Sequence, residues 1–270
     1  VEKLEAIIAE KMGFSNVYRI CGQTYPRKSD YYTLSVLSGI AQSAMKFSGD
    51  IRLLSHLKEV EEPFESKQVG SSAMAYKRNP MRSERITSLA RYVITDTLNP
   101  ALTAGTQWLE RTLDDSANRR ISIPEAFLAT DGILSLCINI ISGGTVYPNV
   151  IRKHLMEELP FMATENILME CVKRGGDRQI LHEAIRRHAV AAGKAVKQDG
   201  ADNDLLDRIA ADPVFGLTRA DIDAIIAAGH FTGLAPEQTR AYVAAVRAAL
   251  AADPTRAAAL ATPDDTKVLV

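Results

Sequence analysis

Hydrophobic residues along the chain recur at the three- and four-residue spacing of helix faces, and no convincing two-residue alternation marks a strand. In the first half this pattern predicts helices over residues 1–12, 29–60, 80–108 and 122–142. Shorter helices are expected over 149–159, 163–174, 177–198, 202–211, 218–228 and 236–252. The sequence therefore predicts an all-α protein.

Local signals mark the ends of several of these helices. Ser29 or Asp30 can cap the second helix and Asn79 the third, because their side chains accept hydrogen bonds from unpaired N–H groups. Pro100 should kink the third helix, since proline lacks a donor and clashes with the preceding turn. Thr218 to Asp221 has the spacing of a capping box. The predicted helices thus begin at recognisable residues.

Tyr147-Pro148 separates the long predicted helices from the short ones. This change predicts two domains. Residues 1–146 would form a bundle of long helices, and residues 147–270 a smaller, all-helical C-terminal domain.

Composition excludes several classes of protein. The 270 residues carry 32 basic and 33 acidic side chains, so no overall basic excess favours nucleic acid or an anionic membrane as a partner. No apolar run reaches the length of about 20 residues that crosses a bilayer, and no signal peptide is recognisable. Three dispersed cysteines and five histidines without a ligand-pair spacing predict neither disulfides nor a metal site. We expect a cytoplasmic protein without cofactors.

Residues 70–79, Gly-Ser-Ser-Ala-Met-Ala-Tyr-Lys-Arg-Asn, combine several features of an anion site. The small residues permit close approach to a ligand, Lys77 and Arg78 supply cations, and the next helix adds its N-terminal N–H groups. Arg82 and Arg85 extend this basic character along one helix face. The alternative is a solvated loop beside an ordinary basic helix face.

Two other polar segments carry candidate chemistry. Residues 110–120 contain three arginines that can bind phosphate or carboxylate, although Asp114 and Asp115 can instead pair with them. Residues 22–29 hold Gln23 among turn-forming residues, and by themselves they indicate only a loop.

Together these segments resemble the fumarase/aspartase superfamily, whose signature loop reads G-S-S-x-M-P-x-K-x-N. The flanking sequence is similar to the adenylosuccinate lyase family in particular. The segments that carry this resemblance are Gln23-Thr-Tyr-x-Arg-Lys28, Tyr76-Lys-Arg-Asn-Pro-Met-Arg-Ser-Glu-Arg85, Arg111-Thr-Leu-Asp-Asp-Ser-Ala-Asn-Arg-Arg120, Glu158-Leu-Pro-Phe-Met-Ala-Thr-Glu-Asn166 and Asp202-Asn-Asp-Leu205. The resemblance thus covers most of the chain.

The resemblance implies a bundle of long helices and a β-elimination that releases fumarate from adenylosuccinate, and from the succinylated aminoimidazole carboxamide ribotide (SAICAR). It implies Ser71 as the general base, with Lys77 and Asn79 stabilising the charge that develops. The positions that match the family's substrate contacts are Gln23, Arg85, Arg111, Ser116 and Arg120. It also implies a homotetramer whose active sites are shared between subunits.

Two departures from the family pattern matter. Ala75 replaces the signature proline, and the family's catalytic histidines belong to segments upstream of Val1. We therefore expect the chain to be the C-terminal portion of a subunit and to be inactive alone. Two other functions remain open: a sister lyase of the argininosuccinate or fumarase type, and a non-catalytic helical scaffold.

Overall fold

The computed structural model describes residues 1–64, 74, 76–228 and 231–261. The chain divides into two compact units, the first comprising Val1–Tyr147 and the second beginning at Pro148. Helices make up nearly all the regular structure of the described residues, with only two short strands. The predicted all-α class is confirmed.

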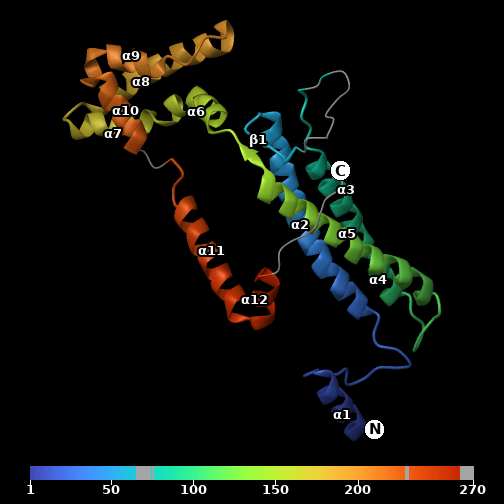
Figure 1. The fold of residues 1–270 in the computed structure, drawn as a ribbon. Coiled ribbons are helices and arrows are strands. Elements are labelled where there is room, and N and C mark those ends of the chain that lie inside the picture. Colours follow the sequence, from blue (N-terminus) through green and yellow to red (C-terminus); the bar gives the residue numbers. More distant parts are fainter. Residues whose placement is uncertain (65–73, 75, 229–230, 262–270) are drawn as a thin grey trace. The chain divides into compact units, whose positions relative to one another are not determined.

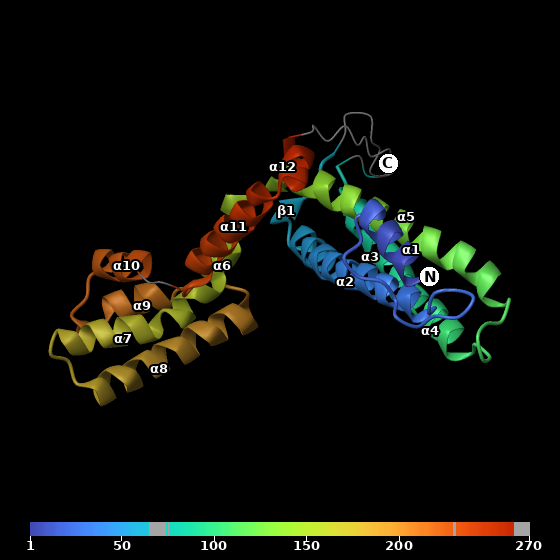
Figure 2. The same cartoon turned by 90° about the horizontal axis from the view of Figure 1, so that it is seen from below.

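Three long helices form the core of the first unit. They are α2 (Lys28–His56), α3 (Met81–Asp96) and α5 (Asp115–Gly143), which lie side by side (Figures 1 and 2). Aliphatic side chains at helical spacing fill the space between them and exclude water, which stabilises the packing. These side chains are Leu34, Leu37, Ala41, Ala44, Ile86, Ala90, Val93, Ala126, Ile133, Leu136 and Ile140.

The first unit has two distinct ends. At one, which we call the arginine end, Arg27 pairs with Asp115, so α2 and α5 begin together. At the other, the strand end, β1 (Val60–Glu61) pairs antiparallel with β2 (Thr145–Val146) after the two helices have finished. Both helices contain 29 residues. At 1.5 Å per residue, the two ends are therefore about 40 Å apart.

The remaining elements of this unit are α1 (Glu2–Met12) and α4 (Leu98–Gly105). Helix α1 ends as predicted, at Gly13 in the left-handed conformation. The kink predicted from Pro100 is confirmed, as a break at Thr97 that separates α3 from α4, whereas the predicted continuation to Trp108 is wrong, because α4 ends at Gly105. The break has a clear cause. Pro100 has no N–H to donate to the carbonyl four residues earlier and its ring clashes there.

Helix α5 begins at Asp115, seven residues before its predicted start, so most of the expected polar break is helical. Gly143 is its last residue, as predicted. Neither Ser29 nor Asp30 caps α2, because the helix begins earlier, at Lys28, with Arg27 at the cap position. The Asp30 carboxylate pairs with Arg119. The predicted Thr218–Asp221 capping box is confirmed, since the Asp221 carboxylate accepts the Thr218 N–H at 2.8 Å.

The second unit packs shorter helices around its own core. Its elements are α6 (Pro148–Met162), α7 (Thr164–Lys173), α8 (Arg178–Lys194), the π-helix η1 (Ala195–Asp199), α9 (Leu205–Ala211), the 3-10 helix η2 (Pro213–Phe215), α10 (Arg219–Ala228), α11 (Ala235–Ala252) and α12 (Pro254–Ala261). Buried aliphatic residues of α7, α8 and α9 meet Phe215 and Ile222 in this core. Most of the short helices are thus held by burial of one apolar face.

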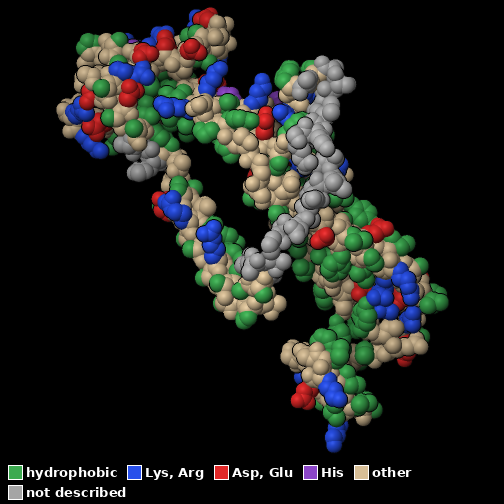
Figure 3. Space-filling model, viewed as in Figure 1, with side chains coloured by type: hydrophobic (Ala, Val, Ile, Leu, Met, Phe, Trp, Pro, Cys, Tyr) green, Lys and Arg blue, Asp and Glu red, His purple; other side chains and the backbone are tan. Residues whose placement is uncertain are grey.

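Helix α5 leaves much of its apolar surface uncovered. Leu128, Leu134, Ile138 and Ile141 are exposed, and hydrophobic side chains spread over the visible face of the bundle (Figure 3). By length and composition alone this helix could cross a membrane, a test that a helix of a soluble bundle also passes. An exposed apolar surface of this extent typically marks a site of association.

A histidine–aspartate pair links α8 to η2 in the second unit. The His188 Nε2 lies 2.8 Å from Asp212 Oδ2, and this hydrogen bond, followed by that from the Val214 N–H, lowers the pKa of Asp212. Stability from a lowered carboxyl pKa is present above the unfolded value near 4 and is lost as pH falls through the folded value.

We therefore expect His188→Ala to lower the free energy of unfolding by about 1 kcal/mol at pH 6. The difference from the unaltered chain should shrink as pH falls through the lowered pKa that Asp212 has in the folded state, because protonation removes the charge of the carboxylate. Urea denaturation followed by circular dichroism across this range measures it. A difference that stays constant with pH would contradict this assignment.

Candidate functional site

The strand end carries Lys77, Asn79 and Arg85, three of the residues predicted to act on a substrate. All three are exposed, and Arg85 lies in the first turns of α3. No ion pair to Lys77 is found among the described residues, so its ammonium group is available to an external anion. The predicted base Ser71 lies outside the described residues.

The N-terminus of α3 is itself occupied by Glu62. The Glu62 carboxylate accepts the backbone N–H groups of Arg82 at 2.9 Å and of Ser83 at 2.7 Å. The cap position of α3 is held by Pro80 and not by the predicted Asn79. The helix N–H groups are therefore not free for a substrate anion, which corrects that expectation and leaves the positive charge to Lys77, Arg78 and Arg85.

Two further contacts join the residues that follow β1 to residues near the start of α3. The Arg82 guanidinium donates to the Pro63 carbonyl, and the Arg78 guanidinium lies 3.4 Å from the centre of the Phe64 ring, a cation–π contact. Glu62 and these contacts join residues about 15 to 20 positions apart. These contacts hold residues close in sequence to Lys77 and Asn79 against the end of the segment that contains Glu62.

Glu62→Ala should therefore destabilise the first unit by about 1 kcal/mol, because two N–H groups at the start of α3 lose their acceptor. Glu62→Gln keeps one carbonyl oxygen and should cost less. Urea denaturation of the two variants measures the difference. An unchanged stability of the alanine variant would show that the Glu62 contact contributes nothing.

At the arginine end, two carboxylates join the segment before α2 to the start of α5. Asp115 is completely buried and accepts a hydrogen bond from Arg27 Nε at 2.6 Å. Asp30 accepts one from Arg119 Nε at 2.6 Å and another from the Tyr25 hydroxyl at 2.7 Å. Ion pairs between the aspartates and arginines of residues 110–120 were the alternative expected from the sequence. The structure contains one such pair, Arg111–Asp115, and two further pairs that involve Arg27 and Asp30.

Burial alone raises the pKa of Asp115. The hydrogen bond from Arg27 and the positive charges of Arg27, Arg111 and Arg119 more than offset this, so its pKa lies below the ordinary value. Asp115 is therefore a buried carboxylate that stays ionised because cations surround it. Removing such a charge partner is costly, since the remaining arginines would be left buried and unpaired.

The arginine end also holds Gln23, Arg111, Ser116 and Arg120. Gln23 and Arg120 are exposed, while Arg111 and Ser116 are partly exposed. Arg120 donates to the Ser116 carbonyl at 2.8 Å and also contacts its hydroxyl. Cationic and hydroxyl donors are thus grouped as a phosphate site requires.

The predicted site residues fall into two groups that this chain keeps apart. Lys77, Asn79 and Arg85 lie at the strand end, and the other described ones lie at the arginine end, about 40 Å away along the bundle. One small molecule cannot touch both groups of a single chain. Sequence reasoning missed the roles of Glu62 and Asp30, because their partners are distant in sequence.

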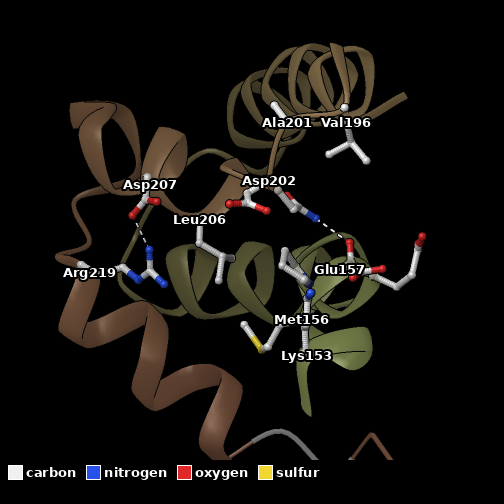
Figure 4. Close-up of a pocket in the computed structure, with 13 residues that line it drawn as sticks. Lys153, Met156, Glu157, Val196, Ala201, Asp202, Leu206, Asp207 and Arg219 are labelled. Carbon is white, nitrogen blue, oxygen red and sulfur yellow. Dashed lines mark hydrogen bonds and ion pairs between the residues drawn. The ribbon is translucent and has the colours of Figure 1, made fainter. Parts of the chain in front are cut away.

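A pocket of about 500 Å³ lies in the second unit, between α6, α9 and α10 (Figure 4). Asp207 pairs with Arg219 there, and Asn203 donates to the Glu157 carbonyl at 2.8 Å. None of the predicted site residues that the structure describes lines it. Among the described residues, no group of three His, Cys, Asp or Glu side chains is placed to hold a metal ion.

Comparison with known proteins identifies relatives along most of the chain. Residues 160–242 match the model of the adenylosuccinate lyase C-terminus, and residues 4–95 match a lyase model. Adenylosuccinate lyase from Schizosaccharomyces pombe is 53% identical over 90% of this chain, and that from Saccharomyces cerevisiae is 50% identical over the same share. The chain spans about half the length of these relatives.

Solved structures with the same fold are more distant. A 3-carboxy-cis,cis-muconate lactonizing enzyme from Pseudomonas putida matches 85% of this chain and 49% of its own, with a TM-score of 0.67 and 21% identity. A fumarate lyase from Mesorhizobium sp. BNC1 matches 83% of this chain and 48% of its own, with a TM-score of 0.63 and 20% identity. These two likenesses establish the helical fold. The sequence matches to the yeast enzymes carry the assignment further: this chain belongs to the adenylosuccinate lyase family.

Proposed function

We propose that the protein is a lyase that eliminates fumarate from adenylosuccinate, giving AMP, and from SAICAR. The observation that carries this proposal is the 53% identity to a curated adenylosuccinate lyase over 90% of the chain. The two groups of site residues support it. The strand end offers cations for a dicarboxylate, and the arginine end offers donors for a phosphate.

In the proposed reaction, Ser71 takes the proton next to a carboxylate. Lys77 and Asn79 then stabilise the doubly charged carbanion that results, which we expect to be the largest catalytic contribution. As the carbanion collapses, the C–N bond breaks and the double bond of fumarate forms, and the family's general-acid histidine, which lies outside the 270 residues of this chain, protonates the leaving nitrogen. An ordinary serine is a weak base, so the reaction needs a site that excludes water and holds positive charge near Ser71. Lys77, six residues along the chain and without an ion-pair partner among the described residues, is the residue that we propose supplies this charge.

At the other part of the proposed site, Arg111, Ser116 and Arg120 bind the phosphate of the nucleotide. Gln23 and Arg85 make further contacts with the substrate. Guanidinium and hydroxyl groups suit a phosphate dianion, because each hydrogen bond is strengthened by charge.

We further propose that the active sites form between copies in a cytoplasmic homotetramer. The two groups lie about 40 Å apart in one chain, so a complete site needs the strand end of one copy and the arginine end of another. The exposed apolar face of α5 supplies a surface for this association.

A fumarate-release assay with the full-length subunit tests the proposed reaction. We expect AMP and fumarate from adenylosuccinate, fumarate from SAICAR, and no turnover of argininosuccinate or malate. Turnover of argininosuccinate or malate alone would establish a sister lyase. Absence of fumarate from every substrate would indicate a helical scaffold without catalysis.

A further inference from the structure

The segment that leads into α5, from Gln107 to Asp115, contains a cluster of buried polar atoms that lack hydrogen-bond partners among the described residues. These atoms are Gln107 Nε2, Arg111 Nε, Thr112 Oγ1 and Asp115 Oδ1. Buried polar groups in folded proteins are nearly always satisfied, so such a cluster calls for an explanation. The hydrogen-bonding capacity of this segment is therefore not used up by the described residues.

Asp115 contacts its two arginines in different ways. Its Oδ2 accepts a hydrogen bond from Arg27, whose side chain is only 6% exposed. Its Oδ1 lies 3.6 Å from Arg111 Nη2, which is close enough for an ion pair but makes no hydrogen bond. Asp115 therefore attracts the Arg111 guanidinium without accepting a hydrogen bond from it.

Arg111 is suited to bind a ligand in this arrangement. Its side chain is 27% exposed, and Asp115 is the only acidic partner found for it among the described residues. A guanidinium carries five N–H donors in a fixed planar arrangement. A neighbouring carboxylate that holds the group in place without consuming these donors reduces the entropy lost on binding an anion.

We propose that Asp115 is a positioning residue of the substrate site, which holds the Arg111 guanidinium ready for the phosphate of the nucleotide. Arg27 anchors Asp115 from the other side, so the position of Arg111 depends on the segment before α2 as well. This inference rests on the proposed function, because it assigns a support to one of the proposed substrate contacts.

Asp115→Asn in the full-length enzyme tests the proposal. We expect the KM for adenylosuccinate to rise about tenfold with kcat nearly unchanged, since a charge-assisted contact to the phosphate is weakened. The KM for the dephosphorylated substrate, succinyladenosine, should stay unchanged. A general structural defect would instead affect both substrates alike.

Asp30→Asn is the matched control. Asp30 is also a largely buried carboxylate at the arginine end, but its partners are Arg119 and Tyr25. This variant should lose stability without changing the ratio of the two KM values. If both KM values rise equally in Asp115→Asn, or neither rises, the positioning role is wrong.

A double-mutant cycle adds a second readout. The effect of Asp115→Asn on KM should disappear when Arg111 is already alanine, because the two residues act through one contact. Should Asp115→Asn fail to fold, Asp115→Glu keeps the charge but moves it, and a phosphate-dependent rise in KM is again expected. If the unaltered enzyme does not turn over adenylosuccinate at all, the proposed function is wrong. If the unaltered enzyme is active but the KM of the Asp115 variants is unchanged, only this inference is wrong.

Discussion

Lys77→Met in the full-length enzyme is expected to lower kcat for adenylosuccinate by about a thousandfold, with a much smaller change in KM. The reaction creates a doubly charged carbanion, and a fixed cation stabilises this charge more strongly in the transition state than in the bound substrate. Lys77 is exposed at the strand end and has no ion-pair partner among the described residues, so its charge is available. Stopped reactions analysed for fumarate give both constants.

Lys173→Met provides the matched control, because Lys173 is an exposed lysine of α7 whose Nζ lies 4.0 Å from Glu170. Its removal should leave both constants nearly unchanged. A Lys77→Met enzyme with more than about a tenth of the normal kcat would be inconsistent with an electrostatic role of this size.

The second large effect concerns the arginine end. Arg111→Ala combined with Arg120→Ala should lower kcat/KM for adenylosuccinate by about a thousandfold, mainly through KM. Each guanidinium contributes charge-assisted hydrogen bonds to the phosphate, and each lost group costs about 2 kcal/mol. Steady-state kinetics of the variant and the unaltered enzyme measure the loss.

Arg91→Ala is a suitable control here, since Arg91 is an exposed arginine of α3 outside both groups of site residues. It should retain normal kinetics. If the double variant instead lost kcat at an unchanged KM, the two arginines would act on the reaction rather than on phosphate binding.

Much of the fold could be predicted because helix periodicity and glycine terminators are local signals. Gly13 and Gly143 end their helices as expected. Pro100 also interrupts its helix as expected, at Thr97, but the end of α4 at Gly105 was not predicted. The early start of α5 was missed because Asp115 is stabilised by Arg27, 88 residues away.

For the site, too, local features could be predicted from the sequence and contacts between distant residues could not. The types of residue at Lys77, Arg111 and Arg120 indicated anion chemistry, since cations and hydroxyl groups gathered in short segments. Their spatial grouping could not be predicted from spacing, because it depends on which ends of α2 and α5 lie together. Glu62 illustrates the limit, since it occupies the helix N-terminus that was expected to be open to an anion.

In the proposed assembly, one active site combines the strand end of one copy with the arginine end of another. Complementation between two inactive full-length variants tests it most directly. One variant carries Lys77→Met, and the other carries Arg111→Ala with Arg120→Ala. The two are co-expressed, and fumarate release from adenylosuccinate is compared with that of each variant alone.

Random mixing gives each site an intact strand end and an intact arginine end in about one case in four, so about a quarter of normal activity should return. Sites formed within single chains would gain nothing from mixing. Activity of the mixture equal to the average of the separate variants would therefore contradict the claim.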